Sequence, residues 1–123
     1  MPIVDVEIVV DDESSVSESL AADLAEAAGE VFGAEPHRTW VRVRTLSTSR
    51  YAENGGGPVG DMMPVFVSVL KATHPASEFM KNEIRHLTDV FASLCQRPSD
   101  NVHVLYLPEG SGRIAFGGTL VER

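Results

Sequence analysis

Cysteine is nearly absent from this sequence of 123 residues, because Cys95 is the only one. A single cysteine excludes an intramolecular disulfide, and no group of Cys and His residues at metal-ligand spacing accompanies it. We therefore expect no metal, and we expect Cys95 to be a small filler of the hydrophobic core.

Long apolar runs are also lacking, since none approaches the roughly 20 residues needed to span a bilayer. The amino terminus has no basic region followed by an apolar stretch, which is the pattern of a secretion signal. From these absences we expect a cytoplasmic protein with no membrane partner.

Basic residues are few: ten Lys and Arg are scattered among eighteen Asp and Glu, and the net charge is −8. A nucleic-acid interface requires clustered positive charge, so nucleic acid is excluded as an expected partner. The segment Gly110-Ser111-Gly112 lacks the Lys-Ser/Thr that follows a phosphate loop, which excludes nucleotide binding.

The first half of the chain has the pattern strand, helix, strand. Residues 2–10 alternate between apolar and polar side chains, and so do residues 40–44, which predicts two strands. Between them, Ser15 and Glu18 have the spacing of a capping box, and Gly33 marks a helix end. The helix itself is predicted from apolar residues at helical spacing, which are Leu20, Leu24, Ala27 and Val31.

The same pattern restarts at Pro64. A strand is predicted from there to near Lys71, Pro75 suits a first helical turn, and a last strand covers residues 101–107. The second helix is predicted from Met80, Ile84, Leu87, Phe91 and Leu94. Val41 and Val43 recur as Val102 and Val104 at one offset, so we interpret residues 1–123 as a single domain with pseudo-repeats 2–60 and 64–121.

Two such units predict an α+β fold. Each β-α-β unit makes a right-handed crossover, which gives a four-stranded mixed sheet with both helices on one face. The opposite face is a mixture too apolar for solvent and too polar for a dry core, and it carries Arg42, Arg44, His103, Leu105 and Leu107. Three sheets packed around a shared centre would cover it.

The motifs within this pattern resemble those of the tautomerase superfamily over essentially the whole chain. Met1-Pro2 leads directly into a strand, Trp40-Val41-Arg42-Val43 is similar to the family's Ser-Val-Arg-Val strand, and residues 112–118 resemble its Gly-x-x-Gly-x-Gly-Gly turn. The doubled length is similar to the subgroups of macrophage migration inhibitory factor, 5-carboxymethyl-2-hydroxymuconate isomerase and malonate semialdehyde decarboxylase.

The resemblance implies a cofactor-independent homotrimer that uses an amino-terminal proline as general base. Pro2 matches that position, provided that Met1 is removed, because a retained Met1 leaves the proline nitrogen as an amide. A partly desolvated pocket lowers the pKa of an α-amino group toward neutrality, where it can move a proton between carbon and oxygen. The implied substrate is a small anionic keto or enol acid, of the 2-oxo or 2-hydroxydienoic class.

The remaining site residues also come from the resemblance. Arg42 matches the family's strand arginine, and Arg44 lies on the same face, where its guanidinium could bind a carboxylate. Relatives carry arginines after the third strand, but residues 71–76 contain none, so Lys71 or His74 would substitute. The carboxyl-terminal turn would supply apolar pocket wall, which makes Ile114 and Phe116 the remaining substrate-binding residues.

Other interpretations remain open from the sequence. Pro2 merely suits a strand start, Arg42 and Arg44 could be solvated, and Phe116 could anchor an interface. The missing arginines favour a non-catalytic trimeric binding protein of the same fold, while a proline-dependent decarboxylase or hydratase is a further alternative. An unrelated ferredoxin-like domain would share the same order of elements.

Overall fold

The computed structural model describes residues 1–58 and 63–122. Its strands are β1 (Ile3–Val10), β2 (Trp40–Ser47), β3 (Val65–Leu70), β4 (Val102–Tyr106), β5 (Ala115–Phe116) and β6 (Thr119–Leu120). Its helices are α1 (Leu20–Phe32) and α2 (Ser77–Cys95), with single 3₁₀ turns η1 (Glu13–Ser15), η2 (Thr48–Arg50) and η3 (Ser99–Asn101). Residues 59 and 60, which end the first predicted repeat, and residue 123 lie outside the described residues.

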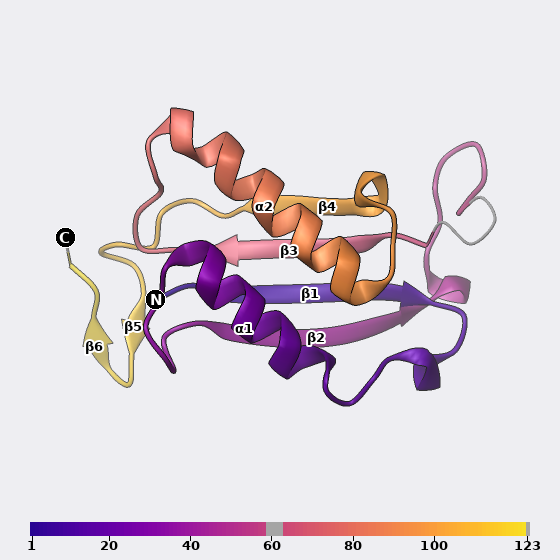
Figure 1. Cartoon of the computed structure of the whole chain (residues 1–123), viewed down its shortest axis with the longest axis horizontal. Helices are drawn as coiled ribbons and strands as arrows, with labels where there is room; N and C mark the ends of the chain where they lie inside the picture. The colour runs from indigo at the N-terminus through magenta and orange to yellow at the C-terminus, as the bar shows by residue number, and fades with distance from the viewer. Residues whose placement is uncertain (59–62, 123) are drawn as a thin grey trace.

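The main sheet has the strand order β2-β1-β3-β4. Strands β1 and β2 are parallel, β3 and β4 are parallel, and β1 joins the two pairs by antiparallel pairing with β3. Figure 1 shows α1 and α2 side by side across the same face of this sheet. The predicted α+β fold, a mixed four-stranded sheet with two helices on one face, is therefore confirmed.

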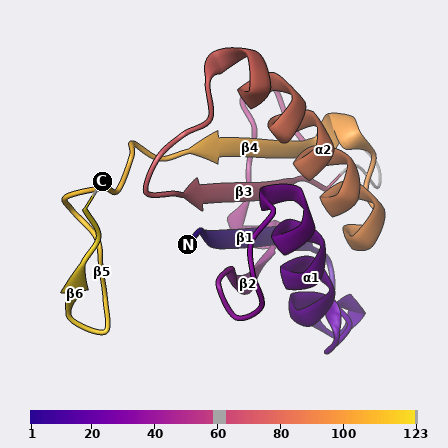
Figure 2. The ribbon, with the colours of Figure 1, turned by 60° about the vertical axis from the view of Figure 1, so that its left-hand side comes forward.

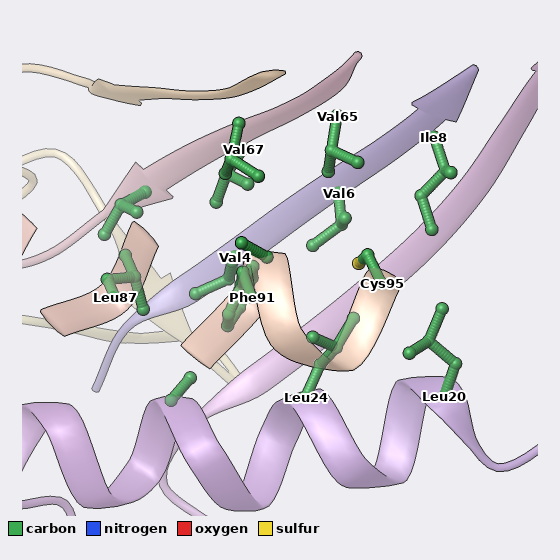
Figure 3. Close-up of a cluster of buried hydrophobic side chains, with 14 of the residues drawn as sticks. Val4, Val6, Ile8, Leu20, Leu24, Val65, Val67, Leu87, Phe91 and Cys95 are labelled. Carbon is green, nitrogen blue, oxygen red and sulfur yellow. The ribbon is translucent and has the colours of Figure 1, made fainter. Parts of the chain in front are cut away.

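The core lies between the sheet and the two helices. Alternate strand residues point toward the helices, so Val4, Val6 and Ile8 of β1 are at most 1% exposed. Leu24 of α1 and Phe91 of α2 meet them from the other side, and both are 0% exposed (Figure 3). Cys95 is buried in the same cluster, as expected for a core filler.

Two details of the predicted helix starts are wrong. Ser15 belongs to the 3₁₀ turn η1, and the residue before α1 is Ser19, whose side chain makes no capping hydrogen bond. Pro75 lies outside α2, because this helix begins at Ser77 after Ala76. At the first of these places the 3₁₀ turn η1 includes Ser15, and at the second irregular chain includes Pro75.

The carboxyl-terminal segment forms a short hairpin that the sequence analysis treated only as a glycine-bearing turn. Strands β5 and β6 pair with each other and form a sheet separate from the main one. Figure 2 shows this hairpin standing away from the body of the molecule, beyond the edge where β1 begins. Within the described residues, neither helix combines the length and apolar character required to cross a membrane.

Within the described residues, the face of the sheet opposite the helices is only partly covered, by Phe116 against Trp40 and by Tyr51 against Phe66. Leu105 is 61% exposed there, and Trp40 and Phe66 are 39% and 36% exposed. Arg42, Arg44 and His103 alternate with inward-facing residues on the same strands, as predicted. This surface is called the open face below.

Candidate active site

The candidate site lies where β1 and β2 begin and β3 and β4 end, next to the amino terminus (Figure 1). Pro2 is buried, and its carbonyl accepts a 3.0 Å hydrogen bond from the backbone N–H of Trp40. Ile3 pairs with Leu70 of the antiparallel strand β3. Continued by one residue, this register places Pro2 beside Lys71, at the usual strand spacing of about 5 Å.

The amino group at this end is electrostatically perturbed. Burial lowers the pKa of the amino terminus on Met1, and the positive charges of Lys71 and Arg38 lower it further. Pro2 is the next residue in the chain, so removal of Met1 would transfer the free amino group to its nitrogen. An amine with a lowered pKa is neutral, and able to accept a proton, closer to neutral pH.

Lys71 is held by a largely buried network. Its Nζ lies 3.0 Å from Glu83 Oε1, with the two side chains 16% and 13% exposed. The hydroxyl of Tyr106 donates to the other carboxylate oxygen, Glu83 Oε2. Burial and then this hydrogen bond raise the pKa of Tyr106 far above its ordinary value, so it is a donor throughout the physiological range. The ammonium of Lys71 also lies 4.7 Å from the ring centroid of Phe32.

The amino terminus, Arg38, Lys71, Glu83 and Tyr106 are called the amino-terminal cluster below. Of these groups, the resemblance in the sequence predicted the amino terminus and Lys71. Arg38 could have been found from strand pairing, because it precedes the strand that begins beside Pro2. The position of Glu83 depends on how α2 is rotated against the sheet, which no local pattern in the sequence indicates.

His74 follows Lys71 but is engaged with the loop after β4. Its backbone N–H donates to Glu109 Oε2 at 2.6 Å, and its Nε2 lies 3.0 Å from the carbonyl oxygen of Leu107. A carbonyl can only accept, so Nε2 carries the proton. The ring also packs edge-on against Tyr106, with centroids 5.7 Å apart. His74 thus ties two loops beside the cluster, and its role toward substrate stays a prediction.

Arg42 and Arg44 do not lie with Pro2 in the same chain. Side chains alternate between the two faces of the sheet, so Pro2 lies on the helix-facing side with Val4. Both arginines lie on the open face. Arg42 donates from Nε and Nη2 to the two carboxylate oxygens of Asp5, at 2.6 and 2.9 Å. This pairing raises the pKa of Arg42. Substrate binding by either arginine stays a prediction, and it would have to involve the open face.

The two apolar residues predicted to bind substrate, Phe116 and Ile114, have different surroundings. Phe116 of β5 stacks on Trp40, with ring centroids 5.0 Å apart and an interplanar angle of 17°. The ring pair borders a shallow groove of about 470 Å³ that also includes Ile3 and Arg42. Ile114 instead lies against Gly110, where an added Cβ would come within 3.0 Å of Ile114 Cγ2. Phe116 is therefore the candidate that shares a concave surface with Arg42.

No family model matches this sequence, and no curated protein matches it by sequence. The fold, however, is similar to that of solved structures. Macrophage migration inhibitory factor from Trichinella spiralis superimposes with a TM-score of 0.76 at 10% identity, covering 96% of this chain and 98% of its own. A fused 4-OT, described as a wild-type symmetric trimer, gives a TM-score of 0.78 at 13% identity over 97% of this chain and 94% of its own.

A malonate semialdehyde decarboxylase inhibited by 3-bromopropiolate is also similar, with a TM-score of 0.70 at 14% identity. That alignment covers 94% of this chain and 88% of the decarboxylase. Identities this low establish a shared architecture and leave the chemistry to be argued from the residues of this chain. The chain therefore shares the fold of these three structures, which is the fold that the resemblance in its motifs predicted.

Proposed function

We propose that this chain is a cofactor-independent tautomerase that uses the amine of Pro2, freed by removal of Met1, as its general base. The observation that supports this most is the lowered pKa of the amino terminus on Met1, which is caused by partial desolvation and by the positive charges of Lys71 and Arg38. A base is most efficient when its pKa lies near the working pH. The proposed substrate is a small anionic 2-oxo or 2-hydroxydienoic acid.

The proposed reaction is a proton transfer by one base. The neutral amine of Pro2 takes the proton of the substrate's enol hydroxyl, and the C–O bond becomes a carbonyl as the π electrons shift along the conjugated system. The resulting ammonium then returns the proton to carbon, which restores the amine. Lys71 and Arg38 would attract the substrate carboxylate, since both positive charges lie beside the amine.

We further propose a homotrimer in which three open faces pack around a shared centre. Exposed apolar side chains on that face, such as Leu105 and Trp40, support this arrangement, as does the trimeric assembly of the similar fused 4-OT. Arg42, Arg44 and Phe116 would then act at a site shared between protomers. This would explain why they lie apart from Pro2 of their own chain.

Substitution of Leu105 with aspartate is expected to break this trimer into monomers, because it places a charge in a face that assembly would desolvate. Light scattering coupled to size-exclusion chromatography measures the change. Phe79→Asp is the matched control: Phe79 is 60% exposed, close to the 61% of Leu105, but it lies on α2 outside the open face. A trimer that survives Leu105→Asp would contradict the proposed packing.

The second candidate function is a trimeric binding protein of the same fold that performs no catalysis. It is favoured by the pairing of the candidate cations, since Arg42 binds Asp5 and Lys71 binds Glu83. A proline-dependent decarboxylase or hydratase is less favoured, because residues 71–76 contain no arginine. These alternatives differ from the tautomerase in the products that they release.

The proposed function is tested by intact mass followed by a ketonisation assay with phenylenolpyruvate and 2-hydroxymuconate. We expect loss of Met1 and activity whose kcat/KM rises with pH through the pKa of the amine. That midpoint should lie below the ordinary α-amino value of about 8, because burial and adjacent positive charge both favour the neutral form. Retention of Met1, or a processed protein inert with both substrates, would favour the binding protein.

A further inference from the structure

Glu83 joins four elements at the end of the sheet that carries the amino terminus. It belongs to α2, and its carboxylate contacts Lys71, which follows β3, and Tyr106, the last residue of β4. Lys71 in turn lies over the ring of Phe32, the last residue of α1. Both oxygens of the carboxylate are occupied, one by the ammonium and the other by the hydroxyl.

This arrangement restricts the position of the Lys71 ammonium. A lysine side chain has a flexible four-carbon stem, and it normally extends its charge into water. Here the ammonium is drawn inward, between a carboxylate at 3.0 Å and an aromatic face at 4.7 Å. Both partners of the ion pair are largely buried, so water screens their attraction only weakly.

Tyr106 restricts the carboxylate in the same way. Its hydroxyl donates to Glu83 Oε2, and its ring is packed against His74. The carboxylate therefore has one orientation in which it satisfies both partners. The ladder between β1 and β3 ends at Ile3 and Leu70, so Pro2 and Lys71 each lie one residue beyond its last pair. The positive charge of Lys71 acts on the amino terminus, so the network reaches the amino end that the proposed function uses.

We propose that Glu83 is a positioning residue of the site: its carboxylate fixes the Lys71 ammonium beside the terminal amine and so determines the positive charge that amine and substrate experience. This inference rests on the proposed role of the terminal amine. A purely structural Glu83 would stabilise the packing of α2 on the sheet but would leave the titration of the amine unchanged.

The test is to titrate the terminal amine directly, by ¹⁵N NMR of the full-length labelled protein, with Pro2 or Met1 as the terminal residue according to intact mass. We expect Lys71→Met to raise the pKa of the amine by roughly 0.5 to 1 unit, because a nearby positive charge is removed. Glu83→Gln should also raise it, because the released ammonium moves into water. The double variant should show no further rise beyond Lys71→Met.

Two outcomes would overturn the inference. If Glu83→Gln leaves the amine pKa unchanged, the residue is only structural; if it lowers the pKa, the carboxylate acts by its own negative charge. Glu18→Gln is the control, because Glu18 is exposed near the start of α1, at the opposite end of the sheet (Figure 1). Ser17 and Leu20, which flank Glu18 in the chain, line the same pocket as Ile8. Ile8 is five residues along β1 from Ile3, or about 17 Å, which is roughly twice the screening length of about 8 Å in physiological salt.

A further variant keeps the inference testable if Glu83→Gln does not fold. Tyr106→Phe removes only the hydroxyl that orients the carboxylate, so we expect a smaller rise of the amine pKa in the same direction. An unchanged pKa in Tyr106→Phe would then overturn the proposal. The titration requires no catalytic activity. A protein that is inert in the ketonisation assay would therefore contradict the proposed function, while the effect of Glu83 on the amine pKa could still be measured.

Discussion

Replacement of Pro2 with alanine is expected to lower kcat/KM for ketonisation by about 100-fold or more, the usual contribution of a positioned general base. Alanine keeps a terminal amino group but loses the rigid ring that fixes the direction of the nitrogen lone pair. It also gives a primary amine in place of a secondary one. Steady-state assays with phenylenolpyruvate, on protein whose loss of Met1 has been confirmed by intact mass, measure the effect.

The matched control for Pro2→Ala is Pro36→Ala. Pro36 is exposed in the turn between α1 and β2, so its replacement should leave kcat/KM within about twofold of the parent. Activity of Pro2→Ala equal to that of the parent would remove the basis of the proposed mechanism. The variant must also be shown to assemble as the parent does, since Pro2 is itself buried.

Replacement of Phe91 with alanine is expected to reduce the free energy of unfolding by about 3–5 kcal/mol, as is typical for a buried phenylalanine. Phe91 is 0% exposed and packs within the cluster that α1, α2 and the sheet share (Figure 3). Its loss removes apolar burial and leaves a cavity that neighbouring side chains fill only in part. Urea unfolding at a fixed protein concentration measures the change, because assembly would also contribute to stability.

The same helix supplies the control for this variant. Phe79 is 60% exposed, so Phe79→Ala should change the free energy of unfolding by less than about 0.5 kcal/mol. Equal losses for the two variants would contradict the assignment of the core to the sheet-facing side of α2. If Phe91→Ala reduces the free energy of unfolding only slightly, neighbouring side chains must move in to fill the space left by the ring.

The sequence predicted the fold well because its apolar periodicity is strong. Alternation in residues 2–10 and helical spacing around Leu87 and Phe91 both identify buried faces, and burial of those faces determines the layers. The helix starts were predicted less well, since Ser15 also suits a 3₁₀ turn and Pro75 also suits an extended segment before a helix. Such local sequence patterns are compatible with several helix start positions, and tertiary packing determines which one the chain adopts.

The candidate site was predicted less completely than the fold. Pro2 comes from a motif position, whereas Lys71 was predicted only as a substitute for arginines that this chain lacks. Each residue lies one position beyond Ile3 and Leu70, the last pair of the ladder between β1 and β3. The pairing of Arg42 with Asp5 was not anticipated, although the register of β1 and β2 puts these residues opposite each other. Glu83 and Arg38 depend on contacts between distant segments, which a residue pattern within one element does not encode.

The strand order also bears on how the chain folds. No two neighbours in the main sheet are joined by a tight hairpin, because β1 pairs with β2 across α1 and with β3 across an even longer stretch. Each ladder therefore requires closure of a long loop, whose entropic cost rises by about 0.6 kcal/mol with each doubling of loop length. The helices can form from local contacts, whereas the sheet must wait for encounters between remote segments. Formation of the central β1–β3 ladder is thus the step that commits both halves of the chain to one cooperative unit.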